Sequence, residues 1–82
     1  MHIRVTFYGR LKQDAGTRQA ALELPGDRAT VRDAVEAALK AYPALAAHLD
    51  TLACSVGAVL ADPGTPIHDG DEIGFLPPVS GG

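Results

Sequence analysis

The start of the chain alternates apolar and polar positions. Residues 3–8 place the apolar side chains of Ile3, Val5 and Phe7 on one face, and residues 19–24 alternate in the same way. A period of two residues is typical of a strand with one buried face. The pattern therefore predicts two strands that pair as an antiparallel hairpin, joined by a short connection in which we expect one helical turn.

A helical period follows the second strand. Apolar side chains recur at intervals of three and four residues and form one stripe, made of Val31, Ala34, Val35, Ala38, Leu39 and Tyr42. Thr30 stands in the N-cap position, and Asp33 stands in the place of its capping-box partner. Pro43 disfavours helical geometry at the residue before it, so we expect the main helix to end at Tyr42. We expect a further short helical piece over residues 44–49.

The rest of the chain predicts a second hairpin and a last strand. Residues 52–60 are mostly apolar, and Gly57-Ala58 would fold them into a tight hairpin with a short fourth strand. Two turns follow, Asp-Pro-Gly and Asp-Gly-Asp. Residues 72–76 then form the last strand, and Pro77-Pro78 ends its pairing because proline has no N–H to donate.

Together these elements predict an α+β domain with the ubiquitin-like β-grasp fold. The expected order is strand, strand, helix and three further strands, in a mixed sheet of four to five strands with one main helix packed on one face. The last strand is expected in the centre of the sheet, beside the first. Residues 1–76 would form the β-grasp domain, and residues 77–82 would project from it as a flexible C-terminal tail.

Composition narrows the range of functions. The 82 residues have a formal net charge of -3, which argues against nucleic-acid binding because that needs a basic face. A single cysteine, Cys54, excludes an internal disulfide and a cysteine-ligated cluster, and we expect it to be a buried apolar filler. The three histidines have no metal-ligand spacing. No apolar run approaches ~18 residues and the N-terminus lacks a signal-peptide layout, so we expect a cytoplasmic protein with no membrane partner.

The end of the chain resembles a known family. Residues 69–82 read Asp-Gly-Asp-Glu, an apolar strand and Pro-Pro-Val-Ser-Gly-Gly, which is similar to the end of the molybdopterin synthase small subunit, a ubiquitin-like sulfur carrier. The opening Ile-Arg-Val-Thr-Phe-Tyr strand and the helix start Thr-Val-Arg-Asp-Ala fit the same family. Two positions depart from its pattern. Gly57 stands where the family often has Asn, and Leu76 stands where the last strand often ends in Phe.

This resemblance implies a protein co-substrate rather than a complete enzyme. An E1-like adenylyltransferase would adenylate the Gly82 carboxylate with ATP, and a sulfur donor protein would convert the adenylate to a thiocarboxylate. The carrier would then dock on the molybdopterin synthase large subunit and give its sulfur to cyclic pyranopterin monophosphate. No cofactor is expected on this chain, since the activating partner consumes the ATP.

Two groups of residues form the candidate site. The first is the tail, whose glycines add no side-chain bulk and whose prolines stiffen an extended chain with a reach of ~20 Å. It consists of Pro77, Pro78, Val79, Ser80, Gly81 and Gly82. The second is a set of apolar residues expected on the outer face of the sheet beside the tail, where they would form a partner-binding patch: Tyr8, Leu60 and Leu76.

Two other functions stay open. A carrier with the same chemistry could serve thiamine thiazole, cysteine or tRNA thiolation, although thiamine-type carriers are usually shorter and lack the Pro-Pro-Val-Ser approach. A ubiquitin-like tagging module would instead join Gly82 to a lysine after the same adenylation. The product distinguishes these functions, because a carrier accumulates a thiocarboxylate and a tag accumulates an isopeptide.

Overall fold

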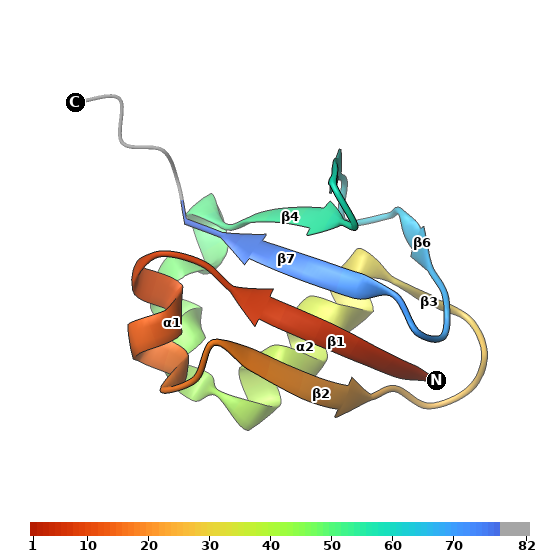
Figure 1. Ribbon diagram of the computed structural model, residues 1–82, viewed down its shortest axis with the longest axis horizontal. Helices are drawn as coiled ribbons and strands as arrows, with labels where there is room; N and C mark the ends of the chain where they lie inside the picture. The colour runs from red at the N-terminus through yellow and green to blue at the C-terminus, as the bar shows by residue number, and fades with distance from the viewer. Residues whose placement is uncertain (78–82) are drawn as a thin grey trace.

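A five-stranded mixed sheet is the main layer of the domain, and one helix packs across one of its faces (Figure 1). The computed structural model describes residues 1–77. The strands of the sheet are β1 (His2–Phe7), β2 (Gln19–Glu23), β4 (Ala53–Val56), β5 (Val59–Ala61) and β7 (Glu72–Leu76). Their order is β2-β1-β7-β4-β5, in which β1 and β7 are parallel and the other neighbours are antiparallel. The β-grasp prediction and the central place of the last strand are confirmed.

The main helix, α2 (Val31–Ala41), begins and ends where the sequence predicts. Its N-terminus has the expected capping box, in which the carboxylate of Asp33 accepts a hydrogen bond from the backbone N–H of Thr30 at 2.8 Å. At the other end Tyr42 leaves helical geometry, with φ -134° and ψ 79°. A residue before proline is disfavoured in the α region, so Pro43 ends the helix as predicted.

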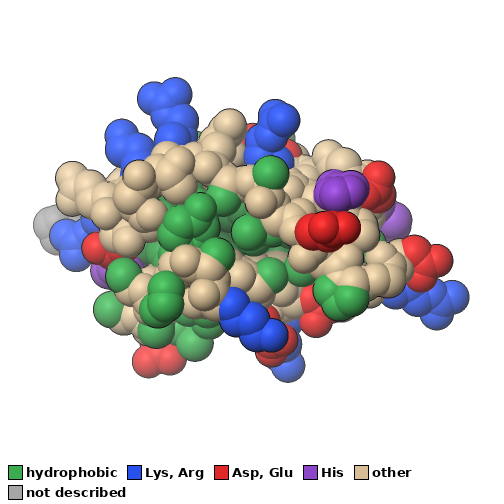
Figure 2. Space-filling model, turned by 90° about the horizontal axis from the view of Figure 1, so that it is seen from below, with side chains coloured by type: hydrophobic (Ala, Val, Ile, Leu, Met, Phe, Trp, Pro, Cys, Tyr) green, Lys and Arg blue, Asp and Glu red, His purple; other side chains and the backbone are tan. Residues whose placement is uncertain are grey.

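The core lies between α2 and the inner face of the sheet. Val5 and Ile73, on the two central strands, are fully buried. The ring of Phe7 meets that of Phe75 with 5.7 Å between centroids and 80° between planes, an edge-to-face arrangement that aromatic pairs favour. Because Ile3, Val5 and Phe7 are all buried, the alternation predicted for the first strand is confirmed. Seen from the β2 edge (Figure 2), hydrophobic side chains reach the surface in the middle of the face, and charged side chains of both signs surround them.

Three features go beyond the sequence pattern. The connection between β1 and β2 forms α1 (Arg10–Ala15) instead of a single turn, and η1 (Pro43–Thr51) is a 3-10 helix longer than the piece expected there. Two short strands, β3 (Ala29–Thr30) and β6 (Pro66–Ile67), pair as a second, antiparallel sheet. A strand of two residues shows no period, and α1 buries only Leu11, so neither leaves a repeating pattern in the sequence.

The base of the predicted tail lies at one end of the sheet. Strands β1 and β7 run in the same direction and both end beside α1 (Figure 1). Pro77 is the last described residue, so the remaining predicted tail residues, Pro78, Val79, Ser80, Gly81 and Gly82, lie outside the described part of the chain. Within residues 1–77, no helix is long and apolar enough to cross a membrane.

Candidate functional site

The outer face of the sheet, opposite α2, has a row of residues in register across its centre. Leu60 of β5 pairs with Ser55 of β4, and Ser55 in turn pairs with Gly74 of β7. On its other side Gly74 pairs with Thr6 of β1. Side chains of directly paired residues share a face of the sheet, so Leu60 lies on the same face as Gly74.

The ring of Tyr8 lies over this row. A Cβ built on Gly74 would come 3.2 Å from Cε2 of Tyr8 and closer still to Oγ of Ser55. The ring and the hydroxyl therefore fill the space above the glycine. Because nearly half of Tyr8 stays exposed, the ring presents an apolar surface with a polar tip to any protein that covers this face.

The three residues predicted for a patch share this face. Tyr8 is 46% exposed, Leu60 is 74% exposed and Leu76 is half-buried. Leu76 follows Gly74 by two residues in the same strand and pairs with Ala53, so it lies on the same face at the end nearest the tail. The structure thus places the predicted residues on one face, with Tyr8 against Gly74 and Leu60 two strands away.

Sequence reasoning missed two residues of this surface, Ser55 and Gly74. The available signal was the glycine itself, because a glycine inside an apolar strand often marks a close approach by another group. We call the set Tyr8, Ser55, Leu60, Gly74 and Leu76 the outer-face patch.

A chain of polar side chains borders the outer-face patch. Thr6 is buried, and its hydroxyl donates a hydrogen bond to Oε1 of Glu72 at 3.2 Å. The side-chain amide of Gln19 donates to the same Thr6 hydroxyl, also at 3.2 Å. These contacts run across β2, β1 and β7. The outer face is therefore polar toward β2 and apolar toward β5.

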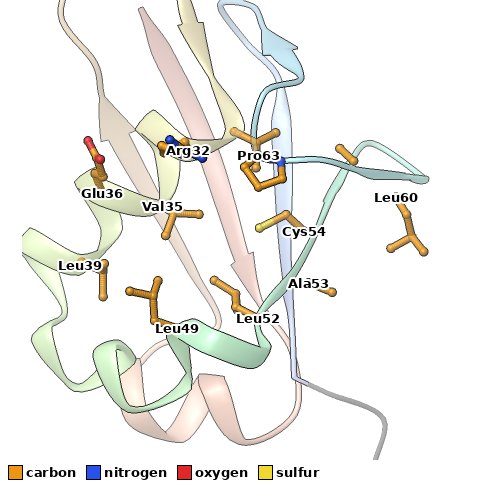
Figure 3. A pocket seen from close by; sticks show the side chains of 12 residues that line it. Arg32, Val35, Glu36, Leu39, Leu49, Leu52, Ala53, Cys54, Leu60 and Pro63 are labelled. Carbon is orange, nitrogen blue, oxygen red and sulfur yellow. The ribbon is translucent and has the colours of Figure 1, made fainter.

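A groove of about 520 Å³ lies between α2 and the β4–β5 hairpin (Figure 3). Apolar side chains of both elements and of η1 line it, among them Val35, Leu39, Leu49 and Leu52. Leu60 also borders the groove, but in Figure 3 its side chain points away from the others. The groove is therefore distinct from the outer-face patch.

Cys54 lies in the wall of this groove and is 7% exposed. Burial raises the pKa of its thiol to about 11, because the thiolate would lose hydration. A thiol with this pKa is protonated at neutral pH and is a weak nucleophile. Cys54 and Ser55 are consecutive strand residues, so the thiol points away from the outer-face patch. The predicted burial of Cys54 is confirmed.

The ring of each histidine lies near one carboxylate. His2 lies 4.0 Å from Glu23, His68 lies 3.7 Å from Asp71, and His48 contacts Asp14. In the described range 1–77, no group of three or more His, Cys, Asp or Glu residues could hold a metal ion.

Sequence comparison relates nearly the whole chain to one family. The model of the ThiS family matches residues 5–82. The molybdopterin synthase sulfur carrier subunit of Chlamydomonas reinhardtii is 31% identical over 84 residues, which cover 100% of both chains. Small archaeal modifier protein 1 of Haloferax volcanii is 35% identical over 86 residues, which cover 92% of this chain and 94% of that protein.

Solved structures share the fold over the full length. The crystal structure of SAMP1 from Haloferax volcanii has a TM-score of 0.89 and 31% identity, with 100% of both chains covered. The complex of subunits 1 and 2 of molybdopterin-converting factor from Helicobacter pylori contains a chain with a TM-score of 0.72 and 29% identity, again with 100% of both chains covered. These comparisons confirm both the resemblance and the fold predicted from the sequence.

Proposed function

This chain belongs to the ThiS family, and we propose that it is the sulfur-carrier subunit of a molybdopterin synthase. An E1-like enzyme adenylates the Gly82 carboxylate with ATP and releases pyrophosphate. A sulfur donor protein then supplies the sulfur that replaces AMP, which leaves a thiocarboxylate on Gly82. The large subunit of the synthase receives the charged carrier, and the sulfur passes to cyclic pyranopterin monophosphate. In this proposal the chain binds no cofactor and works in the cytoplasm.

The observation that carries the proposal is the continuity between β7 and the tail sequence. β7 passes through Gly74 and Leu76 of the outer-face patch and leads directly into Pro77. The sequence then continues as Pro-Val-Ser-Gly-Gly. A partner that covers the outer-face patch is therefore next to the base of the segment that carries Gly82. The full-length similarity to the Chlamydomonas subunit supports the same function.

The outer-face patch has the character of a protein-binding surface. Tyr8 and Leu60 are large, exposed and apolar, and exposed apolar clusters of this kind are typical of docking sites. Tyrosine is also enriched among the residues that dominate binding energy. The polar chain through Thr6 and Glu72 would form part of the rim. We assign this patch to the large subunit and to the E1-like enzyme, and the Helicobacter pylori complex of two subunits supports a protein partner.

Protein tagging is a second candidate function, because small archaeal modifier protein 1 is 35% identical to this chain. Both functions begin with the acyl-adenylate on Gly82. They differ in the group that displaces AMP, which is sulfur for a carrier and the amine of a lysine for a tag. The same difference separates the tag from carriers for thiamine thiazole, cysteine or tRNA thiolation.

Intact-mass analysis of the protein from its native cell tests the proposal. A carrier should show a species heavier by about sixteen mass units, the difference between sulfur and oxygen at the terminal carboxylate. The matched control is the same protein with Gly82 deleted, which should lack that species. Conjugates through an isopeptide bond would favour the tagging function, and a chain that forms neither product with an E1-like enzyme present would contradict both.

The pathway is tested separately with the large subunit. Carrier that already bears the thiocarboxylate is mixed with large subunit and cyclic pyranopterin monophosphate, and molybdopterin is measured in a single turnover. Formation of molybdopterin supports the synthase function. A charged carrier that gives no sulfur to this substrate would assign the chain to another thiolation pathway.

A further inference from the structure

Gly9 holds Pro77 at close range. The backbone of Gly9 has φ 58° and ψ -135°, and a Cβ built on it would lie 2.9 Å from Cγ of Pro77 and 3.6 Å from Cδ. Cβ atoms essentially never come within 3.0 Å of another heavy atom. The ring of Pro77 therefore occupies the space that any side chain on residue 9 would need.

Gly9 differs in this respect from the other described glycines with positive φ. Gly16, Gly26, Gly57 and Gly70 have φ between 60° and 87°, but nothing lies within 4 Å of a Cβ built on any of them. Positive φ alone accounts for glycine at those turns. At Gly9 a second constraint is added, which is the ring packed on its α-carbon.

The contact joins two chain segments that leave the centre of the sheet side by side. The backbone N–H of Tyr8 donates to the carbonyl of Phe75 at 3.0 Å, after which the first segment turns at Gly9 into α1. The second segment leaves β7 at Pro77, which has no N–H with which to extend the ladder. Beyond the Tyr8 hydrogen bond, packing of Pro77 on Gly9 therefore holds the end of β7 against the turn.

We propose that Gly9 is a positioning residue that seats Pro77 and thereby sets the direction in which the chain continues from β7 toward Gly82. This inference rests on the proposed function, in which Gly82 enters the active site of a partner docked on the outer-face patch. Fixing the first residue of the tail reduces the conformations from which insertion starts, which lowers the entropy lost on insertion. The position of the Gly82 carboxylate matters for the reaction, because misplacing a reacting group by about 1 Å can lower a rate ~100-fold.

The competing explanation is that Gly9 serves only the turn into α1, whose N-cap position it occupies. Gly16 at the other end of α1 provides a control for a methyl group on a capping glycine of the same helix. Gly9→Ala and Gly16→Ala both place a methyl group on a residue with positive φ, at 58° and 76° respectively. Because ψ is -135° at Gly9 and 10° at Gly16, the backbone strain is larger for Gly9→Ala, and the Pro77→Ala background described below separates that strain from the contact with the ring. Only the methyl group of Gly9→Ala meets Pro77.

Adenylation by the E1-like enzyme of the same organism is the kinetic assay. For Gly9→Ala we expect kcat to fall about tenfold or more, with KM within about twofold because the outer-face patch is unchanged. Gly16→Ala should keep both constants within about twofold of the wild type. Equal losses of kcat in the two variants would overturn the proposal and leave Gly9 as a turn residue.

A second pair of variants tests whether the effect passes through the proline ring. Pro77→Ala removes the ring, so adding Gly9→Ala in that background should change kcat by less than about twofold. If Gly9→Ala still lowers kcat about tenfold in the Pro77→Ala background, the proposal is overturned. Should Gly9→Ala fail to fold, Pro77→Ala and the wild-type Overhauser contacts described below decide together, because Pro77→Ala also removes the stiffness of the proline and only the contacts report on Gly9. Pro77→Ala should lower kcat without changing the melting temperature. An unchanged kcat in Pro77→Ala would overturn the proposal that Gly9 positions Pro77.

Nuclear magnetic resonance gives a readout that does not depend on activity. In the wild type we expect Overhauser contacts between the α protons of Gly9 and the ring protons of Pro77. We also expect Gly9→Ala, and not Gly16→Ala, to shift the amide signals of Gly81 and Gly82. Absence of the Gly9–Pro77 contacts overturns the proposed role of Gly9 even if adenylation proceeds normally. Their presence in a protein that no E1-like enzyme adenylates would instead overturn the proposed function.

Discussion

The ring of Tyr8 packs against the α-carbon of Gly74, with Cε2 only 3.2 Å from the place where a Cβ would stand. The two residues belong to the neighbouring parallel segments at the centre of the sheet. Ser55 closes the same space from the other side. The missing side chain at Gly74 therefore lets Tyr8 lie close to the sheet, and this fixes the shape of the outer-face patch.

Gly74→Val should weaken partner binding while the domain stays folded. Valine suits a strand, but its side chain needs the space that the Tyr8 ring and the Ser55 hydroxyl fill. We expect the Kd for the E1-like partner to rise about tenfold or more, while the free energy of unfolding falls by less than ~3 kcal/mol. Calorimetric titration and urea unfolding measure the two quantities. Gly64→Val is the control, since nothing lies within 4 Å of a Cβ built on Gly64. A wild-type Kd for Gly74→Val would contradict the prediction.

Leu60→Asp should weaken partner binding by about 2 kcal/mol or more, because a charge would replace the most exposed large apolar side chain of the outer-face patch. Val59→Asp is a closely matched control, because Val59 precedes Leu60 in β5 and is 70% exposed against 74% for Leu60. The two side chains point to opposite faces, so Val59→Asp should leave the Kd unchanged. A similar loss of affinity in both variants would mean that the partner covers the edge of the sheet and not its outer face.

Deletion of Gly82, or extension of the chain by one residue after it, should abolish adenylation because the reacting carboxylate is displaced. The melting temperature should stay at the wild-type value, since the core consists of residues within the described part of the chain. Mass spectrometry of the acyl-adenylate and thermal melting measure the two properties on the same samples. A truncated protein that still accepts AMP would show that the carboxylate of Gly82 is not the activated group.

The fold could be predicted from the sequence where burial is periodic. Ile3, Val5 and Phe7 alternate because one face of β1 packs on the core, and the stripe from Val31 to Tyr42 recurs because one face of α2 does. The two-residue strands β3 and β6 have no room for a period, and they form because the chain before α2 meets the segment after β5. Such pairings depend on tertiary structure, and short-range patterns do not contain them.

Some residues of the candidate site could likewise be predicted from the sequence, and others could not. Tyr8 and Leu76 could be assigned to the outer face because the parity of a strand determines which face a side chain takes. The contacts of Gly74 could not, since they are made by a ring that follows β1 and a hydroxyl of β4, both far from Gly74 in the sequence. The contact between Gly9 and Pro77 likewise joins residues far apart in the sequence, and two common turn residues carry no mark of it.

The contribution of Cys54 to stability should depend on pH. Burial raises the pKa of the thiol to about 11 in the folded protein, so the folded state keeps its proton at a pH where the unfolded state loses it. This contribution is therefore fully present below the pKa of the unfolded thiol and is lost as pH rises toward 11. The difference in free energy of unfolding between wild type and Cys54→Ala should narrow by about 1 kcal/mol between pH 8 and pH 10. A constant difference would contradict the raised pKa.

Cys54→Ala should also leave sulfur transfer unchanged if the sulfur travels on Gly82 alone. The substitution removes one buried sulfur atom and should cost ~1–2 kcal/mol of stability, depending on how far the surroundings collapse. Cys54 is 7% exposed, and its thiol is protonated at neutral pH and points away from the outer-face patch. The thiol therefore cannot meet a substrate held by a partner on that patch. Single-turnover transfer from preformed thiocarboxylate, at a temperature where the variant is fully folded, should match the wild type. A large loss of rate with folding intact would mean that Cys54 relays the sulfur, and the chemistry assigned to Gly82 would then be shared by two residues.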